Sequence, residues 1–217
     1  MKGHHISDQT ELINLMISRC EAEDENGAII CLDQEKAYDK ITHTFLWASL
    51  NKLGFPDHFT NTVKSLYKRT QTKILINGEY STLYAIVQGV HQGDPLSCLL
   101  FNIAIESLAA LLRASPLASF NIPGLPDRLL LTLFADDTTI FLSSNDSYET
   151  LQAILRLWCQ ASGAKFNINK TVILPTSPPV HRASMLKTHC LNPNHSPIPD
   201  GVQLPMMANQ YEPWAPL

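Results

Sequence analysis

The chain has 217 residues, of which 45% are hydrophobic, and this suits one domain of moderate core size with at most a partial second lobe. The net charge of −4 is unfavourable for broad phosphate binding, so most of any nucleic-acid surface is expected to lie outside this chain. The five cysteines show no paired spacing, so neither a disulfide framework nor a zinc ribbon is indicated, and reduced, intracellular thiols are expected. Neither a signal peptide nor a membrane span is expected.

The first third of the chain predicts a helix, a buried strand and two further helices. Residues 8–23 carry apolar side chains at helical spacing. An apolar, partly β-branched strand over residues 28–33 follows and ends in the carboxylate of Asp33. Helices are then predicted over residues 44–53 and from Pro56 onward, where a proline ring suits a first helical turn.

The middle of the chain predicts a hairpin and a long helix. Asn77-Gly78, flanked by runs at residues 73–76 and 80–87, is the strongest hairpin signal in the sequence. Asp94-Pro95 then opens a helix through Arg113 with leucines and isoleucine at helical spacing. Polar residues interrupt this apolar run, so a core helix is expected rather than a membrane span.

A second hairpin presents two adjacent carboxylates. Asp136 and Asp137 lie between the apolar runs 129–133 and 138–142, which places them at a hairpin tip where oxygen ligands can converge on Mg²⁺. Ordinary turn chemistry is the alternative, since Asp is common in turns. If Asp33 lies on a neighbouring strand, three carboxylates meet and a cation would offset their repulsion. An Asp33 that ends its strand and faces water is the competing interpretation.

The C-terminal part predicts one more helix and then a change of character. Residues 147–160 carry apolar side chains at helical spacing, with Gly163 beyond the end. Residues 175–217 hold nine of the fourteen prolines and little periodicity. We therefore expect a folded region over residues 1–174 and an extended or disordered tail over residues 175–217.

Four segments, in order, resemble successive motifs of reverse transcriptases, and they are most similar to those of non-LTR (LINE-type) retrotransposons. The resemblance implies an α+β fold, namely a right-hand polymerase palm with an antiparallel sheet backed by helices, partial fingers and no thumb. It also implies an incomplete form whose missing lobes are supplied by a longer polyprotein. The segments are residues 32–39 (LDQEKAYD), 88–97 (QGVHQGDPLS), 134–137 (FADD) and 162–171 (SGAKFNINKT).

The resemblance implies an RNA-directed DNA polymerase that adds deoxynucleoside triphosphates to a primer 3′-hydroxyl on an RNA template. Two Mg²⁺ ions, with Mn²⁺ as an alternative, would stabilise the attacking and leaving oxygens. Asp33 and Asp136 would bridge the ions. Asp137 would support them, because adjacent strand residues point to opposite faces. The resemblance places the protein in the nucleus or the cytoplasm, and a DNA primer is the expected second nucleic-acid partner.

Further residues fall on positions with a role in the family. Tyr38 would exclude a 2′-hydroxyl from the incoming sugar, or alternatively pack in the core. Gln92 would touch the incoming nucleotide, and Gly93 would let the backbone approach it. Lys170 would stabilise or protonate the leaving pyrophosphate, or be an ordinary surface lysine. The chain departs from its relatives at His91, where arginine is common, so a permanent cation is missing there.

Two other functions stay open. A catalytically inactive palm remnant of a degenerate element would carry the same motifs and bind nucleic acid weakly at most. A palm-fold nucleotide cyclase is disfavoured by Tyr38 and by Gln92-Gly93. A basic cluster is either a local template track or a solvated helix face; it consists of Lys64, Lys68, Arg69 and Lys73.

Overall fold

The computed structural model describes residues 6–68, 70–91, 93–176, 179–192, 196–199 and 202–204. The chain forms two compact units, each assembled from segments far apart in the sequence. We call them the first unit (Met1–Gln34, Ala109–Leu157 and Phe166–Leu217) and the second unit (Glu35–Leu108 and Trp158–Lys165).

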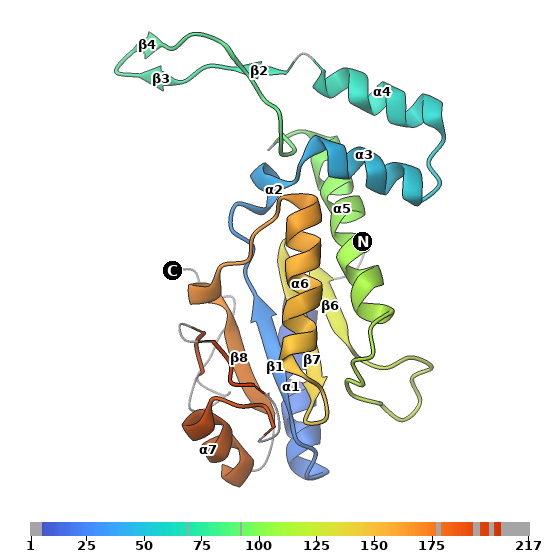
Figure 1. Cartoon of the computed structure of the whole chain (residues 1–217), viewed down its shortest axis with the longest axis vertical. Helices are drawn as coiled ribbons and strands as arrows, with labels where there is room; N and C mark the ends of the chain where they lie inside the picture. Colours follow the sequence, from blue (N-terminus) through green and yellow to red (C-terminus); the bar gives the residue numbers. More distant parts are fainter. Residues whose placement is uncertain are drawn as a thin grey trace. The chain divides into compact units, whose positions relative to one another are not determined.

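The first unit contains an antiparallel sheet with the strand order β6-β7-β1-β8 (Figure 1). All six residues of β1 are buried, because β1 is an inner strand and both faces of the sheet are covered by helices. This explains why β1 is an unbroken apolar run rather than an alternating one. The strands are β1 (Gly27–Leu32), β6 (Leu131–Phe134), β7 (Asp137–Ser143) and β8 (Val172–Thr176).

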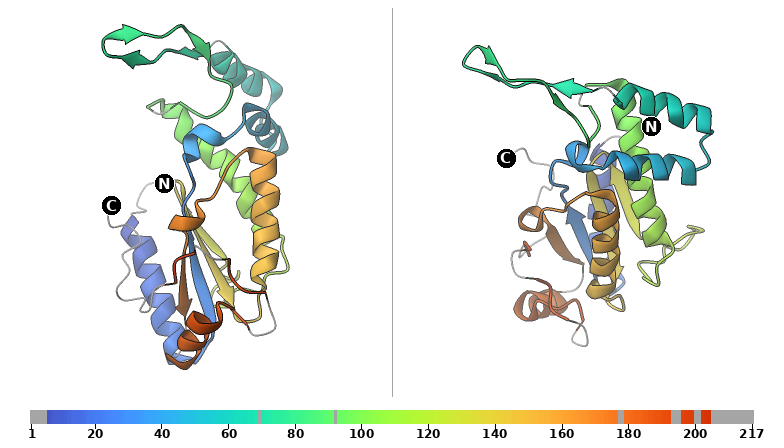
Figure 2. Two further views of the ribbon diagram at one scale, coloured as in Figure 1. Left: turned by 60° about the vertical axis from the view of Figure 1, so that its left-hand side comes forward. Right: turned by 45° about the horizontal axis from the view of Figure 1, so that its top comes forward.

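Helices cover both faces of this sheet. The helix α1 (Ile6–Ala22) lies on one face and α6 (Tyr148–Ser162) on the other, as the turned view of Figure 2 shows. Successive strand residues point to opposite faces, so Ile29 of β1 packs toward α1 while its neighbours pack toward α6. The core on the α1 side is formed by Ile13, Met16, Ile17, Cys20, Ile29, Cys31, Phe120, Phe141, Val172 and Leu174.

The buried carboxylate of Asp146 holds together two loops of the first unit. It accepts hydrogen bonds from the backbone N–H of Ser119 at 2.8 Å and of Ser143 at 2.9 Å, and also from the backbone N–H of Ala118. The Ser143 hydroxyl donates to it at 3.1 Å. Asp146 is 4% exposed, and its carboxylate satisfies the N–H groups of Ser119 and Ser143, which are buried as well.

The second unit consists of helices and a short β-arm. Its helices are α2 (Ala37–Lys40), α3 (His43–Lys52), α4 (Asp57–Tyr67) and most of α5 (Pro95–Arg113). The arm pairs β2 (Gln71–Thr72) with β5 (Tyr84–Ala85), and β3 (Leu75–Ile76) with β4 (Glu79–Tyr80).

The turn of the arm confirms the prediction from Asn77-Gly78. Leu75 pairs with Tyr80 and Ile76 with Glu79, so these two residues form the turn, with φ of 52° and 87°. The paired strands are only two residues long, and the longer runs predicted over 73–76 and 80–87 are wrong. The arm side chains are exposed and gain little from burial, so the pairing beside the turn is short, and β2 and β5 form a separate short pair farther along the arm.

The long helix α5 is confirmed within one residue of its predicted start. Asp94 caps it by accepting from the backbone N–H of Leu96 at 2.9 Å. Within the described residues it is the one helix with the length and apolar content of a membrane span, but its inner face is buried in the protein. Trp158 of α6 is 1% exposed and donates to the Ser107 hydroxyl of α5 at 2.9 Å. Leu99 and Leu111 of α5 are exposed, so the leucines of this helix do not all face inward.

The segment after residue 174 is more structured than the proline content predicts. The strand β8 continues to Thr176, and α7 (Pro179–Thr188) follows, with Pro179 at its first position. Met185 of α7 is 1% exposed, and Arg182 forms an ion pair with Glu21 of α1. The expectation of an extended or disordered tail is therefore wrong for the first part of residues 175–217, because one buried side chain and a strand edge anchor it.

The reactivity of the cysteine thiols tests directly whether the central strand β1 is buried. Cys31 lies in β1, and burial raises the pKa of its thiol to about 12. Cys98 is exposed. At pH 8 we expect an alkylating reagent to modify Cys98 rapidly and Cys31 only after denaturation, since the thiolate is the reactive form. Peptide mass spectrometry gives the extent at each site, and modification of Cys31 in the native protein would contradict the buried central strand.

Candidate active site

The carboxylate hairpin joins β6 to β7 by two residues. Phe134 pairs with Asp137, which leaves Ala135 and Asp136 as the turn. Ala135 has a φ of 53°, an unfavourable conformation for a residue with a Cβ atom. Such strain is retained where the surrounding structure enforces it. The hairpin predicted from the sequence is confirmed, with Asp136 in the turn and Asp137 as the first residue of β7.

Asp33 directly follows β1, which is the neighbour of β7. The register pairs Leu32 with Thr138, so the residues that follow Leu32 and precede Thr138 come next to each other in the ladder. These residues are Asp33 and Asp137. The sequence predicted Asp33 as the last residue of a strand neighbouring Asp136; it comes directly after that strand instead, next to Asp137, and all three carboxylates are half-buried rather than turned fully to water.

The three carboxylates influence one another electrostatically. Burial raises the pKa of Asp137 to about 7, and the negative charges of Asp136 and Asp33 add to the increase. Half-buried carboxylate oxygens that repel one another are suitable ligands for a divalent cation such as Mg²⁺, because its positive charge offsets their repulsion. In the described part of the chain, however, no group of three or more His, Cys, Asp or Glu side chains is already arranged to hold a metal ion.

The raised pKa of Asp137 predicts how the stability of the metal-free protein depends on pH. The pKa of the folded state, about 7, lies above the ordinary value of 3.8, so the folded state keeps a proton that the unfolded state has lost. Stability therefore falls as the pH rises from about 4 to 7 and stays low above that. We expect Asp137→Asn to raise the free energy of unfolding at pH 8 by on the order of 2 kcal/mol after solvent screening.

Urea unfolding in a chelating buffer at pH 5 and pH 8 measures this effect. The increase in the free energy of unfolding that Asp137→Asn gives over the parent protein should be larger at pH 8 than at pH 5. Asp127→Asn removes an exposed carboxylate of the same unit and should show no such growth. Equal increases in the free energy of unfolding at both pH values would contradict the electrostatic repulsion among the carboxylates.

Tyr38 lies in α2, and its ring packs on α5. The ring stacks on Phe101 with 4.7 Å between centroids and an angle of 21° between planes, and its hydroxyl donates to the Cys98 sulfur at 3.8 Å. Both interactions leave the residue partly exposed. The packing interpretation from the sequence and a role against an incoming sugar are thus compatible, because the contacts with α5 hold the ring in place.

The second motif contacts the backbone beside Tyr38 through Gly89. The N–H of Gly89 donates to the Ile41 carbonyl at 2.7 Å, and the N–H of Val90 donates to the Tyr38 carbonyl at 2.7 Å. A Cβ atom on Gly89 would lie 2.8 Å from the Asp39 carbonyl oxygen, and its φ is 81°. The role of Gly89 in holding the second motif against α2 was not predicted, although the pair Gln88-Gly89 is present in the sequence.

The rest of the second motif is only partly described. Gln92 lies outside the described residues. Gly93 has a φ of 91° with open space where a Cβ atom would be, so its role stays a prediction. His91 stacks on Tyr67 at 4.7 Å and 16°. That contact occupies one face of the His91 ring.

The fourth motif runs beside the segment that follows β1. The N–H of Asn167 donates to the Asp33 carbonyl at 2.9 Å, and Gln34 pairs with Phe166. Lys170 is the last residue of a short 3-10 helix, η1 (Ile168–Lys170), and its side chain is exposed. The structure therefore brings the motif to Asp33 through the backbone, while the catalytic role of Lys170 stays a prediction.

An ion-pair cluster in the second unit was not found from the sequence. The Glu35 carboxylate lies 3.0 Å from the Lys40 ammonium and 3.0 Å from the Lys165 ammonium. These lysines, Lys165 first, hold the pKa of Glu35 below its usual range. The backbone N–H of Glu35 also donates to the Lys165 carbonyl at 2.8 Å. The first and fourth motifs are thus tied together by contacts that motif spacing does not indicate.

Comparison with known proteins decides the family. Residues 1–185 match the family described as reverse transcriptase (RNA-dependent DNA polymerase). The chain belongs to the reverse transcriptase family. Among relatives of this reverse transcriptase, the uncharacterized 149 kDa protein of transposon TX1 from Xenopus laevis is 30% identical over 174 residues. The Pol polyprotein of the type-2 retrotransposable element R2DM from Drosophila melanogaster is 26% identical over 166 residues.

These relatives confirm the LINE-type assignment, since both come from non-LTR retrotransposons. The matches cover 78% and 76% of this reverse transcriptase but only 13% and 15% of the two relatives. Apo telomerase from Candida tropicalis, truncated from its C-terminal domain, superposes with a TM-score of 0.54 at 19% identity, covering 79% of this chain and 35% of that one. This likeness confirms the α+β fold with an antiparallel sheet and helices.

Proposed function

We propose that this reverse transcriptase chain is an RNA-directed DNA polymerase domain that adds deoxynucleotides to a primer 3′-hydroxyl. One observation carries the proposal. In a member of this family, strand pairing puts Asp33 beside the Asp136-Asp137 hairpin, and the charges of Asp33 and Asp136 help to raise the pKa of Asp137 to about 7. Such mutual perturbation is characteristic of functional carboxylates.

Asp33 and Asp136 would hold two divalent cations, and Asp137 would support them from the start of β7. Bound Mg²⁺, or Mn²⁺ in its place, supplies charge stabilisation for the attacking 3′-oxygen and the leaving pyrophosphate. The carboxylates position that charge at the end of β1 and at the hairpin tip, two elements fixed by the sheet. Lys170 would donate a proton to the leaving pyrophosphate or stabilise its negative charge.

The first and second motifs would contribute contacts to the nucleotide. Gln92 would contact the incoming deoxynucleoside triphosphate, and Gly93 would allow backbone approach. Tyr38 would exclude a ribose. The RNA template and the DNA primer are the proposed partners, and a nuclear or cytoplasmic location is part of the proposal.

The gate proposed for Tyr38 has a specific test. Tyr38→Ala removes the ring, so we expect the preference for deoxynucleotides over ribonucleotides, measured as the ratio of kcat/KM values, to fall by at least about 10-fold. Tyr38→Phe keeps the ring and removes the hydroxyl that contacts the Cys98 sulfur, so the ratio should be retained. An unchanged ratio in Tyr38→Ala, with both substrates affected equally, would show that the ring only packs on Phe101.

Primer extension on an RNA template with Mg²⁺ and deoxynucleotides tests the overall proposal. Extension by the purified chain that is lost in Asp136→Asn supports the polymerase. No extension by either protein, with an intact far-UV circular dichroism spectrum, would support the inactive remnant instead. Cyclic nucleotide product from a nucleoside triphosphate without primer would point to a cyclase.

A further inference from the structure

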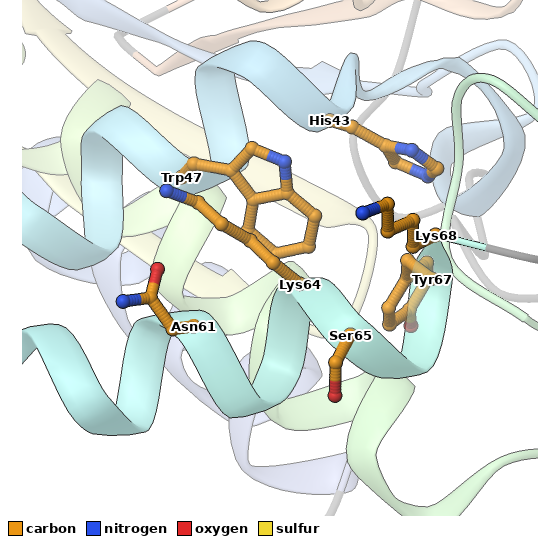
Figure 3. Close-up of a pocket in the computed structure, with 7 residues that line it drawn as sticks. All are labelled: His43, Trp47, Asn61, Lys64, Ser65, Tyr67 and Lys68. Carbon is orange, nitrogen blue, oxygen red and sulfur yellow. The ribbon is translucent and has the colours of Figure 1, made fainter.

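A cleft of about 470 Å³ opens between α3 and α4 in the second unit, whereas the carboxylates belong to the first unit (Figure 3). His43 and Trp47, four residues apart on α3, line one side. Asn61, Lys64, Ser65 and Lys68, which repeat at helical spacing along α4 and its last turn, line the other. One wall is thus aromatic and the other polar and basic.

The aromatic wall is held in a fixed arrangement. The Trp47 ring meets the Tyr67 ring edge-on, with 5.8 Å between centroids and 71° between planes. His43 meets Tyr67 at 5.2 Å and 78°, and its Nε2 hydrogen-bonds the Gly89 carbonyl at 2.9 Å. These edge-on contacts set the rim of one ring against the face of another, and they hold the indole of the half-buried Trp47 in place before any ligand arrives.

The basic wall carries the charge. Lys64 is partly buried and Lys68 is exposed, one helical turn apart, and no carboxylate is among the described residues that line the cleft. This is a local positive site in a protein whose net charge is −4. Tyr67, 4% exposed, adds a buried hydroxyl that has no hydrogen-bond partner among the described residues. Such a group is costly unless a ligand or water satisfies it.

We propose that this cleft binds single-stranded nucleic acid, with a base stacked on Trp47 and the flanking phosphates held by Lys64 and Lys68. Aromatic faces combined with basic side chains are the usual means of holding a single strand without sequence preference. The inference rests on the proposed function in one respect, since the strand would be the RNA template. The alternative, which the test must exclude, is that Lys64 and Lys68 belong to a solvated helix face that binds no ligand.

The test measures binding of a fluorescein-labelled 12-nucleotide oligoadenylate by fluorescence anisotropy over a range of salt concentrations, without Mg²⁺ or nucleotides. We expect Lys64→Gln/Lys68→Gln to weaken binding and to reduce the slope of log K against log salt by about 1.4, that is about 0.7 for each lost phosphate contact. Trp47→Leu should raise Kd by about 5- to 150-fold with the slope unchanged. Trp47→Phe should restore part of this loss.

Lys52→Gln/Lys187→Gln is the matched control, because it removes two exposed lysines that do not line the cleft. Far-UV circular dichroism and thermal midpoints are compared across the variants. Equal losses in the control and cleft double variants, or equal affinity for duplex RNA and the single strand, would overturn the proposal, as would unchanged binding in folded Trp47→Leu and Trp47→Phe.

Binding and primer extension, both measured on the parent protein, separate this inference from the polymerase proposal. Cleft-dependent binding by a parent protein that extends no primer would leave the cleft standing and count against the polymerase proposal alone. Primer extension by the parent protein, combined with binding that ignores the cleft substitutions, would refute the cleft and leave the polymerase proposal in place.

Discussion

Asp136→Asn should reduce primer extension by at least about 10²- to 10³-fold without lowering the stability of the fold. A bound divalent cation contributes several kcal/mol of charge stabilisation in such reactions, and each 1.36 kcal/mol corresponds to a factor of ten in rate. Replacing a carboxylate by an amide of the same shape removes the charged ligand. It also removes one of the charges that raise the pKa of Asp137, so the free energy of unfolding at pH 8 should be unchanged or higher.

The combination of the two measurements distinguishes catalysis from folding. Extension rates are measured at saturating Mg²⁺ and urea unfolding in a chelating buffer. Asp127→Asn, an exposed carboxylate between α5 and β6, is the control and should affect neither quantity. Full extension by the Asp136→Asn variant would refute the assignment of the hairpin, and a large loss of stability would mean that the inactivity has a structural cause.

Asp146→Ala should destabilise the first unit by about 3 kcal/mol or more. The Asp146 carboxylate accepts from the backbone N–H groups of Ala118, Ser119 and Ser143, and it is almost fully buried. Removing a buried acceptor leaves each donor unsatisfied, and every unsatisfied buried group costs roughly 1–3 kcal/mol. Ser119 has a φ of 56°, so its strained backbone loses the contact that holds it in place.

Urea unfolding followed by circular dichroism measures this loss. Asp146→Asn keeps one carbonyl oxygen as an acceptor and should lie between the alanine variant and the parent protein. Asp127→Ala, on the exposed loop, should change the unfolding free energy by less than about 0.5 kcal/mol. A similarly small change in Asp146→Ala would mean that water replaces the carboxylate at these donors.

Local features were predictable because they depend on a few neighbouring residues. The Asn77-Gly78 turn follows from the ease with which these residues adopt positive φ, and the start of α5 follows from an Asp cap before a proline. The turn containing Asp136 follows from two apolar runs on either side of a polar pair. The α7 helix was missed because proline content counts against order, whereas Pro179 sits at a first helical turn, where its ring is tolerated.

The sequence by itself determined the family, the order of most elements up to residue 160 and the identity of the acidic residues, because motifs, caps and turns are encoded within short segments. Only the tertiary structure decided that Asp33 lies beside Asp137, since the register of Leu32 with Thr138 joins residues more than one hundred positions apart. The close contact of Gly89 with α2 and the cleft beside Trp47 also depend on the tertiary structure. Such contacts depend on how distant segments pack, and short-range sequence patterns do not specify that packing.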